Sequence, residues 1–202
     1  MFGIGFHKTG TTTLAGALEF LGYRACHGAE PLRRRFGDDL LMMLLRQRIV
    51  APIFRAADAF DAFSDNPWFQ LFREIDEAFP GSRFILTERA EDRWLASAVR
   101  YFGRTESALR RWTYGPGNPV GNETLYRDAY RRHNLSVREY FNARPRDLLI
   151  VDWEAGDGWT KLCGFLGVEP PITAFPHLQR GGCLTEPERT HSLLPRPQTS
   201  AT

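Results

Sequence analysis

The chain of 202 residues predicts an α/β fold in which helices cover both faces of a parallel sheet. Two observations carry this prediction. Short apolar runs alternate with helical patterns along most of the chain, and strands that alternate with helices form parallel sheets. The first apolar run also leads through a glycine-bounded turn directly into a helical pattern, which is the local context of phosphate-binding loops. A single domain is expected, because this length suits one α/β core and is short for two.

The expected elements follow from apolar spacing and from the residues that end each pattern. The predicted strands span residues 2–6, 23–26, 59–64, 83–88 and 148–151. The predicted helices span residues 11–21, 30–47, 67–79, 90–102, 122–141 and 159–166. The stretch 30–47 fits either one amphipathic helix or two, and Pro52 marks a break beyond it,.

Caps and apolar rows define four of these helices further. Gly22 is expected to end the first helix. Asn66 is expected to cap the third helix, with Pro67 at its first position. The expected apolar rows are Trp94, Ala98 and Tyr101 in the fourth helix and Leu125, Ala129, Leu135 and Tyr140 in the fifth,.

The composition is that of a globular protein. Hydrophobic residues make up 43% of the chain, which is too many for a disordered one,. The formal net charge of +2 is too small to indicate nucleic-acid binding,. Among the basic residues only Lys8 and Lys161 are lysines, so a lysine inside a glycine-bounded loop suggests that its compact ammonium group is needed there,.

The cysteines, the apolar runs and the composition of the chain ends indicate the expected compartment and domain bounds of the protein. Cys26, Cys163 and Cys183 fit neither a disulfide framework nor a zinc spacing,. No apolar run reaches membrane-spanning length, and the first strand leaves no room for a signal peptide, so a cytoplasmic protein without a membrane partner is expected. The expected domain spans residues 1–183, and the Pro-, Thr- and Ser-rich residues 184–202 are expected to be a disordered tail,.

The segment 5–12, called loop 5–12 below, has the sequence Gly-Phe-His-Lys-Thr-Gly-Thr-Thr. Its glycines allow backbone N–H groups to converge on an anion, and the helix that follows adds its partial positive charge. In nucleotide triphosphatases a lysine follows the second glycine and precedes a Ser or Thr that holds Mg²⁺. Here Thr11 occupies that position and Lys8 precedes Gly10 by two residues. The loop therefore suits a phosphate group and argues against a kinase or a GTPase.

Residues 8–12, Lys-Thr-Gly-Thr-Thr, resemble the 5′-phosphosulfate loop of sulfotransferases, the enzymes that use 3′-phosphoadenosine 5′-phosphosulfate (PAPS). The resemblance implies a P-loop-type three-layer fold with a central parallel sheet. It extends over roughly residues 2–178, with the elements in the same order. It also implies transfer without a required metal, which leaves 3′-phosphoadenosine 5′-phosphate (PAP) as the product.

A second motif supports this resemblance. Arg89 stands at the end of the strand 83–88, and Ser97 follows eight residues later in a helix. Sulfotransferases carry an arginine and a serine at this spacing, and the two bind the 3′-phosphate of PAPS. A guanidinium group offers a planar fork of donors that suits a phosphate. The donor-binding residues that the resemblance implies are His7, Lys8, Thr9, Gly10, Thr11, Thr12, Arg89 and Ser97.

Sulfuryl transfer needs charge neutralised on the departing phosphate and a base for the acceptor's proton. Lys8 suits the first task. Asp65 follows the third strand, where ligand sites form in α/β sheets, and the resemblance favours it as the base. Asp65 and Asn66 could instead simply cap the next helix. His7 is the main alternative base because it lies in loop 5–12 and imidazole titrates near neutral pH.

The other polar residues have weaker grounds. His133 could be structural or line the acceptor side, and His27 and His177 are taken as surface histidines. Asp152 and Glu154 end the last strand, where capping is the simpler role. The segment 180–182, Arg-Gly-Gly, faintly resembles one that closes over the 3′-phosphate in larger sulfotransferases, but a plain loop is expected.

The acceptor is expected to be a small molecule with a hydroxyl or amine group, and a homodimer could complete its pocket. Two other classes of protein stay open. A small-molecule kinase would bind ATP with Mg²⁺, and a non-catalytic module would bind a nucleotide without turnover.

Overall fold

The computed structural model describes residues 1–56 and 58–178. Five parallel strands form one sheet in the order β2-β3-β1-β4-β5. The strands are β1 (Phe2–Gly3), β2 (Ala25–His27), β3 (Ala62–Ser64), β4 (Phe84–Thr87) and β5 (Leu148–Val151). This confirms the predicted α/β fold with a central parallel sheet. The predicted tail 184–202 and the segment 180–182 lie outside the described residues.

Eight α-helices and two 3₁₀ turns are described between and after these strands. The helices are α1 (Thr11–Phe20), α2 (Glu30–Arg46), α3 (Ala51–Ala56), α4 (Phe72–Ala78), α5 (Glu91–Phe102), α6 (Ala108–Tyr114), α7 (Glu123–Phe141) and α8 (Trp159–Leu166). The 3₁₀ turns are η1 (Trp68–Leu71) and η2 (Trp153–Ala155). Helix α2 is interrupted at Gly37, whose φ of 71° and ψ of 167° are not helical, so the stretch predicted as one helix or two consists of two helical segments joined at this residue.

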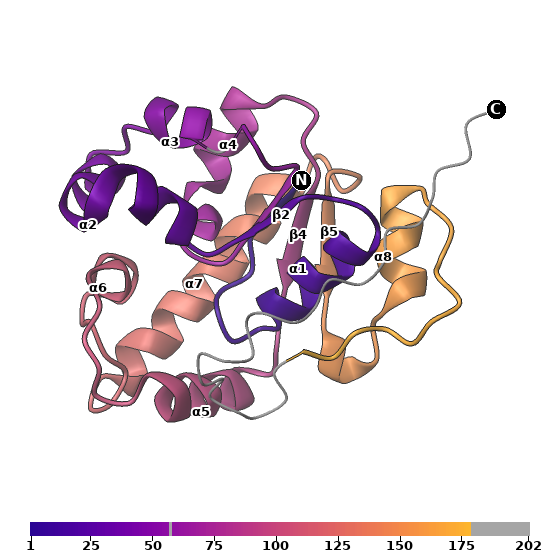
Figure 1. Ribbon diagram of the computed structural model, residues 1–202. Coiled ribbons are helices and arrows are strands. Elements are labelled where there is room, and N and C mark those ends of the chain that lie inside the picture. The colour runs from indigo at the N-terminus through magenta and orange to yellow at the C-terminus, as the bar shows by residue number, and fades with distance from the viewer. Residues whose placement is uncertain (57, 179–202) are drawn as a thin grey trace.

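The helices form two layers around the sheet (Figure 1). Helices α1 and α8 pack on one face, where Leu14, Leu18 and Leu162 are fully or almost fully buried. The other helices cover the opposite face, which holds the larger core. Side chains of one strand alternate between the two cores, as Phe84 and Ile85 do, because successive side chains of a strand point to opposite faces.

Two predicted helical details are wrong. Asn66 does not cap a helix that begins at Pro67. The chain instead forms η1 and then α4, and neither has a side-chain cap. In the fifth predicted helix, now α7, Leu125 and Leu135 are 50% and 57% exposed. The buried face is shifted, with Tyr126, Ala129, Tyr130, Val137 and Phe141 packed against the core.

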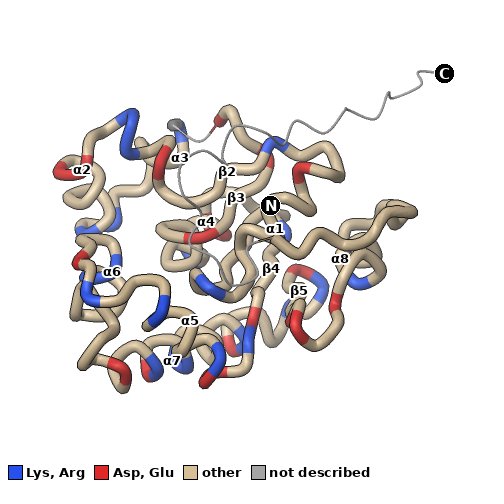
Figure 2. The backbone as a smooth tube through the Cα atoms, turned by 60° about the horizontal axis from the view of Figure 1, so that its bottom comes forward, with Lys and Arg blue, Asp and Glu red and all other residues tan. Residues whose placement is uncertain are grey.

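The apolar row of α5 holds only in part, and two helices, α3 and α6, were not predicted. Trp94 and Ala98 are fully buried, whereas Tyr101 is 46% exposed. Helix α6 begins after Ser107, whose side chain accepts a hydrogen bond from the Arg110 amide. Basic and acidic residues occur along both α5 and α7 (Figure 2), and ion pairs of Arg127 and Arg131 with Glu91 join the two helices.

Gly22 ends α1 as predicted. Its φ is 91°, and its N–H donates to the Glu19 carbonyl, which is the left-handed geometry that glycine favours at a helix end. None of the helices in residues 1–56 and 58–178 is both long and apolar enough to cross a membrane.

Candidate active site

Each of the five strands ends in or leads to a polar residue at the same edge of the sheet. His27 is the last residue of β2. The others are His7 and Lys8 after β1, Asp65 after β3, Arg89 after β4 and Glu154 after β5. Because all strands are parallel, their carboxyl ends share one edge, which is where open α/β sheets bind ligands.

Loop 5–12 runs close to the sheet and depends on its two glycines. A Cβ at Gly5 would lie 2.1 Å from the Thr87 hydroxyl oxygen, so only glycine fits there. Gly10 has a φ of 90°, and a Cβ on it would lie 2.3 Å from the Trp153 ring. The close approach of the backbone to β4 and to the indole therefore fixes the course of the loop.

The three loop threonines have different partners. The Thr9 hydroxyl contacts the Phe6 carbonyl at 2.5 Å and the Thr87 hydroxyl at 2.6 Å. The Thr11 hydroxyl donates to Asp65 Oδ2 at 2.9 Å. The Thr12 hydroxyl lies 3.3 Å from Nε2 of His27. Two of these side chains thus hold the loop to neighbouring strands, and Thr9 offers an anion no free hydroxyl.

Helix α1 begins directly after Gly10, which gives its N-terminus no side-chain cap. The first-turn amides of any helix lack acceptors within it. These amides and the partial positive charge of the helix end suit an anion such as a phosphate. The backbone of the loop can therefore bind the phosphate that the sequence predicts.

Lys8 is half-buried and has a φ of 67°. Its Nζ lies 3.6 Å from the centre of the Tyr101 ring, a distance at which a cation is attracted to the ring face. Its carbonyl oxygen accepts a hydrogen bond from Arg89 at 3.5 Å. These contacts orient a primary ammonium group at the same edge of the sheet as the α1 N-terminus.

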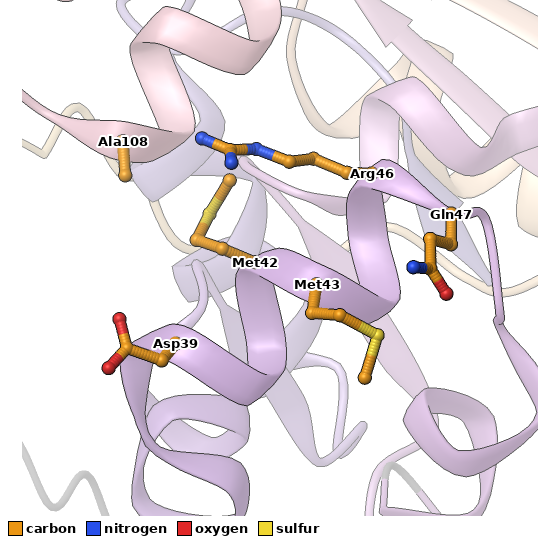
Figure 3. Close-up of a pocket in the computed structure, with 6 residues that line it drawn as sticks. All are labelled: Asp39, Met42, Met43, Arg46, Gln47 and Ala108. Atoms are coloured by element: carbon orange, nitrogen blue, oxygen red, sulfur yellow. The ribbon is translucent and has the colours of Figure 1, made fainter.

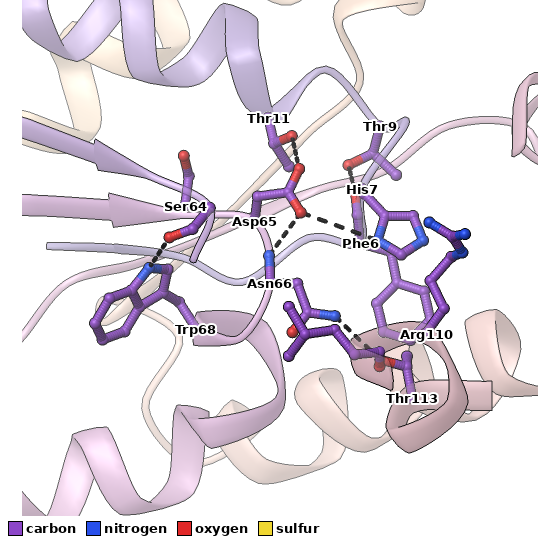
Figure 4. Close-up of polar contacts among 12 residues, drawn as sticks. Phe6, His7, Thr9, Thr11, Ser64, Asp65, Asn66, Trp68, Arg110 and Thr113 are labelled. Carbon is purple, nitrogen blue, oxygen red and sulfur yellow. Dashed lines mark hydrogen bonds and ion pairs between the residues drawn. The ribbon is translucent and has the colours of Figure 1, made fainter. Parts of the chain in front are cut away.

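Asp65 lies at the centre of the polar edge (Figure 4). Its φ is 70°, a conformation that Asp and Asn tolerate better than most residues. Oδ1 accepts the Asn66 N–H at 2.6 Å and Oδ2 accepts the Thr11 hydroxyl. Burial raises the pKa of this carboxyl, but His27, His7 and the two hydrogen bonds outweigh it, so the net shift is downward. Asp65 is therefore a carboxylate at neutral pH and a weak base.

His7 lies on the inner side of Asp65. Its Nδ1 is 3.9 Å from Asp65 Oδ1, and its Nε2 is 2.5 Å from the Tyr114 hydroxyl. Burial lowers the pKa of His7 to about 4 and raises that of Tyr114 well above its usual range. Both groups are then neutral at pH 7, and the contacts are satisfied when Tyr114 donates to Nε2. His7 is 6% exposed, so neither nitrogen is open to an incoming acceptor.

His27 is exposed, as predicted for a surface histidine, but it also makes contacts that the sequence did not predict. Its Nε2 lies 3.7 Å from Asp65 Oδ2, and its Nδ1 lies 3.0 Å from the Ser64 hydroxyl. The side chain is 36% exposed, compared with 7% for His7. The polar edge thus contains a histidine that faces both Asp65 and the solvent.

Arg89 is bound by Glu154, which does not act as a cap. The Arg89 guanidinium donates to Glu154, and Arg93 pairs with the same carboxylate at 3.4 Å. Nε of Arg89 is buried and has no hydrogen-bond partner in the described residues. Ser97 lies on the buried face of α5 with 6% exposure. Arg89 therefore keeps an unused donor next to an ion pair that a stronger anion could displace.

The remaining candidates are structural. His133 donates from Nε2 to the Ile4 carbonyl at 2.6 Å and stacks on Phe6, and burial lowers its pKa to about 4. Asp152 caps η2 by accepting the Glu154 and Ala155 amides, as predicted. Cys26 and Cys163 are free and buried. No group of three or more metal-ligating side chains occurs among the residues that the structure describes.

A pocket of about 360 Å³ lies between α2 and α6 (Figure 3). Its lining residues are Asp39, Met42, Met43, Arg46, Gln47 and Ala108. None of these residues follows a strand, so the pocket does not belong to the polar edge.

The two buried histidines should make the fold sensitive to mild acid. Between pH 6.5 and 4 the folded chain leaves His7 and His133 neutral while the unfolded chain protonates them, so stability rises with pH in this window,. Each histidine can contribute up to about 1.4 kcal/mol per pH unit. Urea unfolding from pH 6.0 to 4.5 measures the slope. In His133→Gln, whose amide can still donate to the Ile4 carbonyl, the slope of the free energy of unfolding against pH should fall to about half. An unchanged slope would contradict the claim that His133 is neutral in the folded chain.

Comparison with known proteins shows the family to which the chain belongs. Residues 1–120 and 100–183 match the family model described as Sulfotransferase domain. The chain therefore belongs to the sulfotransferase family, as the resemblance of loop 5–12 predicted. It is also similar to "Ava biosynthesis cluster protein M" of Aspergillus versicolor, with 25% identity over 209 residues that cover 87% of this chain and 78% of that protein.

Proposed function

We propose that this sulfotransferase moves a sulfuryl group from PAPS to a hydroxyl or amine group of a small molecule. The main support is that one sheet edge combines an anion-binding helix start, a loop lysine and a strand-end arginine. Lys8 and the α1 N-terminus suit the 5′-phosphosulfate end of the donor. Arg89 suits its 3′-phosphate.

Lys8 would act on the charge that develops as the donor's phosphate departs. A fixed cation close to a leaving group stabilises it more strongly in a partly desolvated site than in water. The amides of the first turn of α1 would hold the same phosphate. Thr11 and Thr12 would shape this part of the site through Asp65 and His27, to which their hydroxyls are bound.

Arg89 would bind the 3′-phosphate with donors that now contact Glu154, together with its unpartnered Nε. A phosphate accepts a bidentate pair of hydrogen bonds from a guanidinium group. Binding would displace Glu154, which could remain paired with Arg93. Ser97 would add a donor from the buried face of α5.

The acceptor's proton would be taken up in the group around Asp65, since its carboxylate is a negative charge that lies within 4 Å of His7 and His27. Thr11 and the Asn66 amide hold this carboxylate by hydrogen bonds. A small hydroxylated or amine acceptor would approach from the exposed side.

A kinase is the second candidate, because the contact of Thr11 with Asp65 joins the two residue types that hold Mg²⁺ in many P-loop enzymes. The position of Lys8, before Gly10, disfavours it. Calorimetry separates the two functions: PAP should bind without Mg²⁺, whereas binding of ATP only with Mg²⁺ would favour the kinase. A screen of hydroxylated and amine compounds with labelled PAPS then tests turnover, and PAP binding without any transfer would indicate a non-catalytic module.

Arg89→Ala should weaken PAP binding by roughly tenfold or more, because hydrogen bonds to a charged group are worth about 1.5–3 kcal/mol. AMP lacks the 3′-phosphate and should lose much less affinity. Glu154→Gln should have the opposite effect and tighten PAP, since it frees Arg89 from an ion pair. Calorimetry with both ligands measures these changes, and equal weakening of PAP and AMP in Arg89→Ala would refute the 3′-phosphate assignment.

A further inference from the structure

His27 is held in place by the end of β3. It pairs with Ser64 in the register of β2 and β3, and its Nδ1 contacts the Ser64 hydroxyl. The next residue, Gly28, donates its N–H to the Ser64 carbonyl at 2.8 Å and accepts the Trp68 indole N–H at 3.2 Å. The Ser64 contact therefore orients the imidazole, and the two Gly28 contacts hold the backbone next to it, while 36% of the His27 side chain stays exposed.

The same imidazole borders loop 5–12. Its Nε2 is 3.3 Å from the hydroxyl of Thr12, which lies in the first turn of α1. A phosphosulfate bound at that turn would have this nitrogen beside it. A general base must lie within reach of the acceptor oxygen that attacks there.

Asp65 acts on His27 through its charge. At 3.7 Å the contact between Nε2 and Oδ2 is too long for a hydrogen bond,, and both carboxylate oxygens already accept closer donors. The Asp65 carboxylate therefore faces Nε2 of His27 as a fixed negative charge and not as a hydrogen-bond partner.

We propose that His27, rather than Asp65 or His7, takes the acceptor's proton, with Asp65 as the residue that stabilises the resulting imidazolium. This rests on the proposed function. The role requires the tautomer in which Nδ1 donates to the Ser64 hydroxyl, so that the lone pair of Nε2, which lies 3.3 Å from the Thr12 hydroxyl, can accept the proton.

In the transfer step the acceptor oxygen forms a bond to sulfur, and the bond from sulfur to the bridging oxygen of the phosphosulfate breaks. That electron pair stays on the 5′-phosphate of PAP. The acceptor proton moves to Nε2 of His27 and is later released to water. His27 therefore serves as the catalytic base, and the hydrogen bonds from Thr11 and the Asn66 amide keep Asp65 in position.

The test uses the full chain with PAPS and water as the acceptor, so that no acceptor need be known. His27→Asn places an amide N–H near the Nδ1 position and removes Nε2, which leaves room for free imidazole. PAP release should fall by roughly 10²-fold, with PAP affinity and the thermal midpoint nearly unchanged. Added imidazole should restore part of the rate. His177→Asn, which changes another exposed histidine, should behave as wild type in every assay.

Two outcomes would overturn the role of His27 alone: a His27→Asn rate within about threefold of wild type, or a loss that imidazole does not restore. His27→Gln provides a second variant if the first is unstable. A wild-type chain that neither binds PAP nor releases it from PAPS would instead overturn the proposed function, and the role of His27 with it.

Discussion

Lys8→Ala should lower sulfuryl transfer from PAPS by roughly 10²–10³-fold, the usual cost of removing one group that stabilises transition-state charge. The reason is the place of Lys8 in loop 5–12, three residues before α1, with its ammonium group above the ring of Tyr101. The fold should stay intact. Lysine and alanine meet the same strain at a φ of 67°,, and the course of the loop is set by Gly5, Gly10 and the Thr9 hydroxyl.

Lys161→Ala is the matched control. Its ammonium group pairs with Asp157 at 2.8 Å on α8, within one helical turn, so the variant should keep full activity and lose at most about 0.5 kcal/mol of stability. Turnover of PAPS and thermal unfolding measure both variants. If Lys8→Ala retains more than about a tenth of the wild-type rate, charge on the leaving phosphate is neutralised elsewhere.

The sequence predicted the frame of the site because that frame depends on local chemistry. Glycines at positions 5 and 10 mark a turn where the backbone approaches its neighbours. In the structure a Cβ at Gly5 would clash with Thr87, and a Cβ at Gly10 would clash with Trp153. An arginine directly after a buried strand must lie at the strand's carboxyl end. Loop 5–12, Arg89 and Asp65 could therefore be assigned to one edge as soon as the strands were placed.

What the sequence could not supply is the pairing of residues distant in the chain. His27 is exposed, as predicted, but its contacts with Ser64 and Asp65 appear only once the register of β2 with β3 sets it opposite Ser64. Glu154 looks like a cap until β5 pairs with β4 and the carboxylate meets Arg89. Each assignment depended on which strands are neighbours, and local spacing carries no such information.

The prediction of which face of α7 is buried was wrong for a related reason. In α7 an apolar row through Leu125 and Leu135 competes with one through Tyr126, Tyr130 and Val137. Aromatic rings bury more surface than leucine, and stacking of Tyr126 on Tyr114 and of Tyr130 on Trp94 selects the second row. Helix α6, which supplies Tyr114, was not predicted, so the decisive partner was missing.

Asp65→Asn should lower turnover by roughly 10²-fold or more while leaving the fold and PAP binding intact. Asparagine tolerates the φ of 70° as aspartate does,. Its amide oxygen can accept the Asn66 N–H, and its amino group can donate to the Thr11 hydroxyl,. The substitution therefore removes one negative charge and little else. The loss should appear in turnover, because that charge stabilises the proton taken up from the acceptor.

PAP affinity gives the control for this variant. A carboxylate close to the start of α1 repels a phosphate, so the neutral amide should leave PAP binding unchanged or make it tighter. Asp65→Ala, which cannot keep the two hydrogen bonds and fits the left-handed conformation poorly, should in addition lose stability. If Asp65→Asn turns over at close to the wild-type rate, the charge of Asp65 has no part in transfer, and its buried contacts with Thr11 and Asn66 serve only to hold loop 5–12 against β3.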